Sequence, residues 1–70
     1  MDKAKRTEFL DSIQGLVDRR PAYAYLQINH FVGEYPPLAR ALAIRADCLI
    51  GFRQVRRALA DLRSAERLCG

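Results

Sequence analysis

Few residues in this chain could carry out covalent chemistry. His30 is the single histidine, and Cys48 and Cys69 stand far apart without a CxxC pair. A structural zinc site needs four Cys or His ligands, usually at short spacings, which these residues do not supply. Neither a GxSxG sequence nor a glycine-rich phosphate loop is present. The sequence therefore predicts no enzyme, no metal site, no cofactor and no small-molecule substrate.

The same residues have structural interpretations. Cys48 lies in an alanine-rich segment, so we expect it to be a small core residue. His30, beside Phe31, is expected to be a helix-terminal or partly buried histidine. Cys48 and Cys69 are both expected to be reduced thiols, because the charged start lacks the apolar run of a signal peptide and predicts a cytoplasmic chain.

Arginine is the other residue type that could recognise a ligand. Residues 1–34 are electrically neutral, whereas residues 35–70 hold seven arginines against three acids, so the net charge of +4 arises there. On a helical wheel of the last segment, five arginines gather opposite the apolar side: Arg53, Arg56, Arg57, Arg63 and Arg67. Guanidinium groups pair with phosphates, base edges and carboxylates, so this face predicts contact with nucleic acid, contact with an acidic protein, or a solvated surface.

The length permits one small domain, residues 1–70, whose core contributes at most about 3–5 kcal/mol. No run approaches the ~18 apolar residues of a membrane span, so no membrane partner is expected. Pro21, Gly33, Pro37 and Gly51 divide the chain, with Gly33 expected to cap the second helix and Pro37 to open the third. Between them, apolar residues spaced by three and four predict helices over residues 3–18, 22–32, 38–49 and 53–68. The expected fold is all-α, with two antiparallel helix-turn-helix hairpins over residues 3–34 and 37–68.

The sequences of the two halves of the chain align when position i is paired with position i+34. The pairing aligns apolar positions and both turns within the hairpins: Leu10 with Ile44, Leu16 with Ile50, Arg19 with Arg53, Ala24 with Ala58, Tyr25 with Leu59, and Ile28 with Leu62. Such a period is typical of stacked helical hairpins.

The second unit resembles a tetratricopeptide repeat, an interaction unit of two antiparallel helices. The residues that carry this resemblance are Leu42, Ala46 and Leu49 in the first helix and Val55, Ala58, Leu62 and Ala65 in the second. Arg53 replaces the family's usual turn glycine, and Gly51 comes two residues early. The YPPL run, Tyr35 to Leu38, and the two segments after it also look like the C-terminal part of the chaperones that cover needle subunits in bacterial type III secretion.

The resemblance implies that an amphipathic helix of a partner lies in a groove lined by the first helix of each hairpin. We expect partner contacts from the exposed aromatic anchors Tyr23, Tyr25, Phe31 and Tyr35, and from Leu42, Ala46 and Leu49, which also build the second hairpin. The partner is another protein or a second copy of this chain, because two repeats are fewer than a continuous core needs.

A helix-turn-helix DNA reader is the alternative. Residues 38–52 resemble such readers, with Leu38, Ala39, Leu42 and Ile44 at the expected core positions. That register puts Gly51 inside the recognition helix, whereas a register with the recognition helix at 53–68 loses the core pattern. The residues expected to contact DNA in this alternative are the arginines of the last helix: Arg53, Arg56, Arg57, Arg63 and Arg67.

Overall fold

The computed structural model describes residues 2–69, and the outermost residues of the predicted 1–70 domain lie outside the described part. It contains α1 (Lys3–Leu16), α2 (Pro21–Glu34), α3 (Ala39–Gly51) and α4 (Val55–Cys69). No strand occurs within residues 2–69. The all-α prediction is confirmed.

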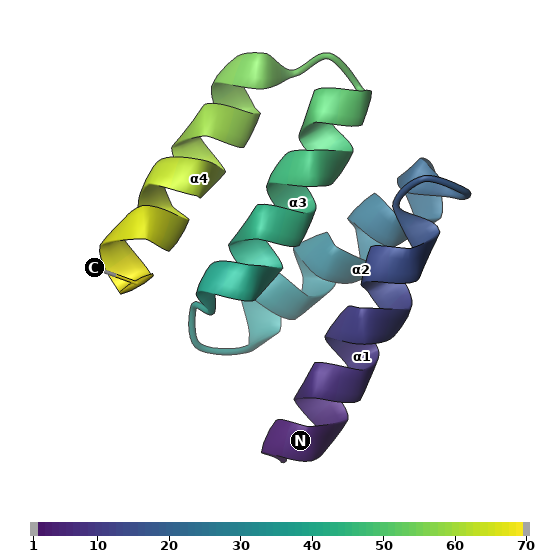
Figure 1. The fold of residues 1–70 in the computed structure, drawn as a ribbon, viewed down its shortest axis with the longest axis vertical. Coiled ribbons are helices and arrows are strands. Elements are labelled where there is room, and N and C mark those ends of the chain that lie inside the picture. Colours follow the sequence, from purple (N-terminus) through teal and green to yellow (C-terminus); the bar gives the residue numbers. More distant parts are fainter. Residues whose placement is uncertain (1, 70) are drawn as a thin grey trace.

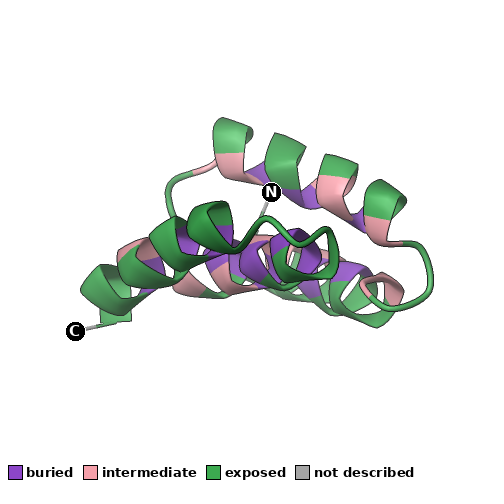
Figure 2. Ribbon diagram, turned by 90° about the horizontal axis from the view of Figure 1, so that it is seen from above, coloured by how far each residue is buried: buried purple, intermediate pink, exposed green. Residues whose placement is uncertain are grey.

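The helices form two hairpins that stack on each other (Figure 1). α1 and α3 run in one direction, while α2 and α4 run in the other. α3 packs against all three other helices, whereas the α4 backbone packs along α3 alone. Figure 2 shows that the buried residues lie where the helices face one another, whereas the outer sides of the helices are exposed. Within residues 2–69, the backbone of the final helix thus lies along one helix, while Tyr25 of α2 packs beside Ala58.

Local chemistry explains where the first two helices begin. Asp2 caps α1, because its Oδ1 accepts a hydrogen bond from the Lys5 backbone N–H at 2.8 Å. Pro21 occupies the first turn of α2, where a missing N–H leaves no bond unmade. α1 begins at the predicted residue, and α2 begins one residue earlier than predicted.

Two predicted helix ends are wrong. α2 does not end at Gly33 but continues through Glu34, since the Tyr35 N–H still bonds the Phe31 carbonyl at 3.1 Å. Pro36 then ends the helix, because a residue before proline is pushed out of the helical region. Pro37 does not open α3, which begins two residues later at Ala39.

The turn between α3 and α4 contains the single non-glycine residue with positive φ in the described part, Arg53 at 63°. The Gln54 N–H bonds the Leu49 carbonyl at 2.8 Å, and the Arg53 N–H bonds the Ile50 carbonyl at 2.9 Å. These two bonds form a Schellman cap, whose left-handed position usually holds glycine. The tetratricopeptide resemblance places its turn glycine at this position, so Arg53 carries backbone strain that glycine does not.

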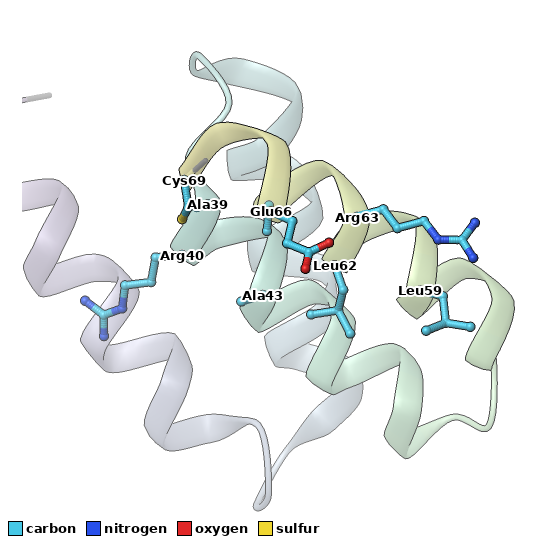
Figure 3. A pocket seen from close by; sticks show the side chains of 9 residues that line it. Ala39, Arg40, Ala43, Leu59, Leu62, Arg63, Glu66 and Cys69 are labelled. Atoms are coloured by element: carbon cyan, nitrogen blue, oxygen red, sulfur yellow. The ribbon is translucent and has the colours of Figure 1, made fainter.

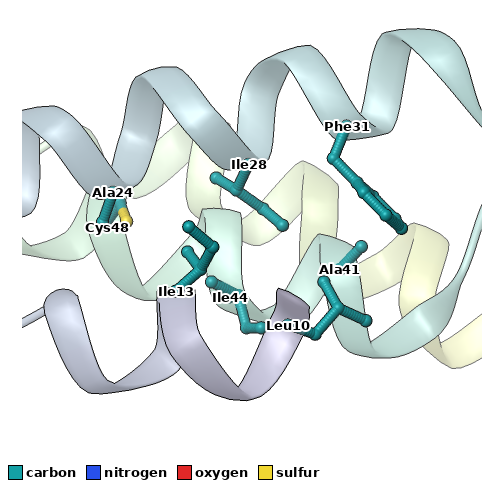
Figure 4. Close-up of a cluster of buried hydrophobic side chains, with 8 residues drawn as sticks. All are labelled: Leu10, Ile13, Ala24, Ile28, Phe31, Ala41, Ile44 and Cys48. Carbon is teal, nitrogen blue, oxygen red and sulfur yellow. The ribbon is translucent and has the colours of Figure 1, made fainter. Parts of the chain in front are cut away.

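The main core lies where α3 covers the first hairpin (Figure 4). Its buried members come from three helices: Leu10 and Ile13 from α1, Ala24, Ile28 and Phe31 from α2, and Ala41, Ile44 and Cys48 from α3. Cys48 is a core residue as predicted, and burial, followed by the nearby Asp47 charge, raises the pKa of its thiol. Both cysteines are free thiols.

A smaller contact joins α3 to α4. Ala46 and Leu49 pack against Ala58, where small side chains bring the two helices close together. Beside them Asp61, 7% exposed, accepts two hydrogen bonds from Arg45, at 2.8 Å from Nε and 2.7 Å from Nη2. This bond raises the pKa of Arg45 against the opposing effect of burial. The pair fixes the register of α4 on α3.

The helix positions support the 34-residue period, because it carries Pro21, where α2 begins, to Val55, where α4 begins. α1 shifted by the same amount covers residues 37–50, close to the observed α3. Among residues 2–69, no helix has the length and apolar character that a membrane crossing requires.

Candidate functional site

A groove of about 850 Å³ lies between α3 and α4 (Figure 3). It exists because α4 turns its small residues Ala58 and Ala65 toward α3 and leaves its leucines beside the contact. Leu59 is 45% exposed and Leu62 is 38% exposed. Leucines on a helix face normally lie against a neighbouring element, so this is an incompletely covered apolar surface.

The groove is built from two helices. Its lining residues are Ala39, Arg40 and Ala43 of α3 and Leu59, Leu62, Arg63, Ala65, Glu66 and Cys69 of α4. The alanines leave room over α3, and the leucines form an apolar wall on α4. Because the helices are antiparallel, Cys69 marks the end of the groove at which α3 begins. The walls supply shape and apolar area.

Charged residues lie at both edges of this surface. Arg40 reaches from α3 toward α1, where it pairs with Asp11. Arg63 extends from α4 away from the groove floor (Figure 3). Helical spacing places Arg56 and Arg67 on the same side of α4 as Arg63, and all three are exposed. These three residues form the arginine rim of the groove.

The five arginines predicted as one face are all exposed, and they have different neighbours. Arg57 lies on the other side of α4, where it donates to Gln54 Oε1 at 2.9 Å and lines a separate polar pocket of about 260 Å³ with Tyr25. Arg53 belongs to the turn before the helix. On a wheel of 100° per residue the four arginines of α4 still lie within about 120° of the helix circumference, with Arg57 at the edge of this arc farthest from the groove.

Phe31 is not an exposed anchor, and that expectation is wrong. Its ring is 2% exposed and lies between Phe9, with ring centroids 5.4 Å apart, and Tyr35, at 4.9 Å. The three α3 residues expected at the binding surface are buried as well: Leu42, Ala46 and Leu49. They face inward because α3 is the central helix, covered from three sides. The residues thus hold the hairpins together rather than line a groove.

The tyrosines lie outside the groove. Tyr23 is exposed on α2 with the Arg20 guanidinium 5.4 Å from its ring centroid. Tyr25 is half-buried and meets Phe52 edge to face at 5.7 Å. Tyr35 packs on Phe31. Their distribution over α2 and its C-terminal end does not create a single anchor surface.

Sequence reasoning missed the groove leucines, Leu59 and Leu62. The signal that could have found them is the width of the apolar side of the last helix, which exceeds what one neighbour can cover. The 34-residue offset gave a second signal, because it aligns Leu59 and Leu62 with Tyr25 and Ile28, which α3 covers in the first hairpin.

His30, the single histidine, lies on α2 outside the groove. His30 is exposed rather than partly buried, and its Nε2 lies 2.7 Å from Glu34 Oε2, one helical turn away. Within residues 2–69 no three His, Cys, Asp or Glu side chains come together as metal ligands. Comparisons with protein-family models, with curated proteins and with solved structures found no match to this chain.

Proposed function

We propose that this protein is a protein-interaction module, a small chaperone or adaptor, that binds an amphipathic helix of a partner protein in the groove between α3 and α4. The observation that carries the proposal is the exposure of Leu59 and Leu62 over a floor of alanines. Apolar grooves of helical scaffolds hold partner helices through residues spaced by three and four.

The dimensions of the site suit a helix better than a small molecule. The groove is open and runs along two antiparallel helices, with Arg63 at its edge and Glu66 beside the leucines of α4. Small-molecule sites usually enclose most of the ligand and place polar groups inside. A chaperone for needle subunits of type III secretion is the finer proposal, supported by the YPPL resemblance; the bound helix then belongs to a needle subunit.

Nucleic-acid binding is the second candidate function, favoured by the exposed arginine rim at Arg56, Arg63 and Arg67. Its geometry is less suited to a helix-turn-helix reader, whose helices cross at about 90–120°, because α3 and α4 lie side by side and antiparallel. Titration with duplex DNA at rising salt tests it. DNA binding by these arginines loses affinity steeply with salt, whereas binding in the apolar groove changes little.

A displayed library of amphipathic helical peptides provides the test of the groove. The selected peptides are titrated against the wild type, Leu59→Ser, Leu62→Ser and the matched control Leu26→Ser, whose leucine is 65% exposed on α2. We expect each groove variant to lose about tenfold or more in affinity and the control to bind normally. Equal binding by all four proteins contradicts the proposal, provided that circular dichroism shows each variant folded.

A further inference from the structure

The groove occupies the same place on the second hairpin as α3 occupies on the first. At the 34-residue offset, the residues that hold α3 correspond to groove residues: Phe9 to Ala43, Tyr25 to Leu59, Ile28 to Leu62, Phe31 to Ala65 and Tyr35 to Cys69. Each residue of the first set is buried in the main core or packed against it. The second set is part of the lining of an open groove. The groove is therefore the vacant position of the next helix in the stack.

We infer that the occupant is a helix of another protein that takes this position, running parallel to α3 and antiparallel to α4, with an acidic residue that pairs with Arg63. This inference rests on the proposed function and specifies the partner. α3 itself defines the direction, since it runs parallel to α1 and antiparallel to α2 (Figure 1).

The position of the acidic residue follows from a contact in the first hairpin. Arg45 of α3 donates from Nη1 to Asn29 Oδ1 of α2 at 3.1 Å. The counterpart of Asn29 in the second hairpin is Arg63. The occupant residue that corresponds to Arg45 thus faces a guanidinium group, so a carboxylate there forms an ion pair and a basic residue is repelled.

The apolar residues of the occupant follow from the α3 residues that meet the first hairpin. Leu38 packs against the main core, and Ala41, Ile44 and Cys48 belong to it. Together with the Arg45 position, this gives an occupant with the pattern apolar–x–x–apolar–x–x–apolar–acidic–x–x–apolar. Two aromatic residues of the first hairpin are replaced by alanines in the second hairpin, which leaves additional space in the groove. Occupant side chains larger than Ala41 and Cys48 are therefore needed to fill that space.

A second copy of this chain fits this position poorly. The acidic residues of α1 lie on a helix whose apolar residues Leu10 and Ile13 are buried in its own hairpin. A face-to-face contact between two α4 helices would bring their arginine rims together, which costs free energy. The charge of the rim therefore favours an acidic helix from a different protein.

The test uses a synthetic 16-residue helical peptide with leucines at the four apolar positions and glutamate at the Arg45-equivalent position. A matched peptide carries lysine there. We expect the wild type to bind the glutamate peptide about three- to tenfold more tightly, and Arg63→Glu to reverse this preference. Arg57→Glu, on the other side of α4, is the control and keeps the wild-type preference.

Orientation is measured by disulfide trapping at Cys69, which is exposed, while Cys48 is buried. We expect a peptide with an activated thiol at its N-terminus to cross-link, because the occupant begins where α3 begins. Preferential cross-linking of a C-terminal thiol, or an unchanged charge preference in Arg63→Glu, overturns this inference and leaves the proposed function standing. Absence of binding by both peptides, together with no effect of the leucine variants on library peptides, contradicts the proposed function itself. Light scattering that shows a dimer whose groove excludes both peptides overturns the inference in favour of a second copy.

Discussion

The two hairpins are built on the same plan but differ in what covers them. In the first hairpin, Ile28 is 0% exposed because α3 lies over it, whereas its counterpart Leu62 in the second is 38% exposed. Phe31 and its counterpart Ala65 are both buried, but the smaller Ala65 also lines the open groove. The same position in the repeat serves as core in one hairpin and as a groove wall in the other.

This difference shows that burial here depends on the neighbour rather than on the helix itself. α4 is the most amphipathic helix, but it has one neighbour, and its apolar surface is wider than α3 can cover. The aromatic residues of the first hairpin complete a closed core. Smaller residues in the second hairpin leave space that an external helix can fill.

The largest contrast is expected between Ile28→Ala and Leu62→Ala. Ile28→Ala removes a fully buried side chain and is expected to lower the free energy of unfolding by about 3–4 kcal/mol. Leu62→Ala removes partly exposed surface and is expected to cost about 1 kcal/mol or less. Urea denaturation measures both; an equal loss for the two variants contradicts the assignment of Leu62 to a groove.

The next largest contrast is expected between two ion pairs that join helices, in the stability lost when each pair is broken. Asp61→Ala leaves the Arg45 guanidinium without its bidentate partner, so we expect a loss of about 2–3 kcal/mol. Asp11→Ala breaks the exposed pair with Arg40 and is expected to cost less than about 1 kcal/mol. The relevant measurement is the shift in thermal midpoint. A reversed order of the two losses refutes the role of Asp61 in fixing α4.

The turns within the two hairpins allow a stabilising test. Arg53→Gly relieves the positive φ and is expected to raise the free energy of unfolding by about 0.5–1 kcal/mol. Arg19→Gly at the equivalent position of the first hairpin, where φ is not positive, is expected to give no gain, because glycine adds entropy to the unfolded chain. Denaturant midpoints distinguish the outcomes, and a gain at both positions contradicts the explanation by strain.

The smallest effect concerns the thiols. The raised pKa of Cys48 means that its neutral form is favoured in the folded state. The buried Cys48 thiol makes its full contribution to the free energy of unfolding below the ordinary thiol pKa of about 8.5. This contribution decreases as the pH rises above that value. We expect this decrease in the wild type and a weaker one in Cys48→Ala. Labelling at neutral pH should modify Cys69 rapidly and Cys48 only on unfolding; rapid labelling of both contradicts the burial of Cys48.

Much of the fold could be predicted because helix periods, prolines and the 34-residue offset are local signals. The bounds of α2 and α3 were less predictable. A helix continues through Gly33 when the backbone N–H groups of the next residues still donate to carbonyls of the preceding turn. The site was harder to predict: Leu42, Ala46 and Leu49 match an interaction repeat, but whether they face a partner or the core depends on how many helices cover α3. Sequence patterns identify the apolar side of a helix without showing which neighbour lies against it.

The most direct measurement is an amide chemical-shift titration of the wild-type protein with the glutamate peptide. We expect shifts that follow the groove, along Ala39 to Ala43 on α3 and Leu59 to Cys69 on α4, with little change around Leu26 on α2. Shifts concentrated on α2, or spread evenly over all four helices, would contradict the central claim that the open side of the second hairpin is the binding site.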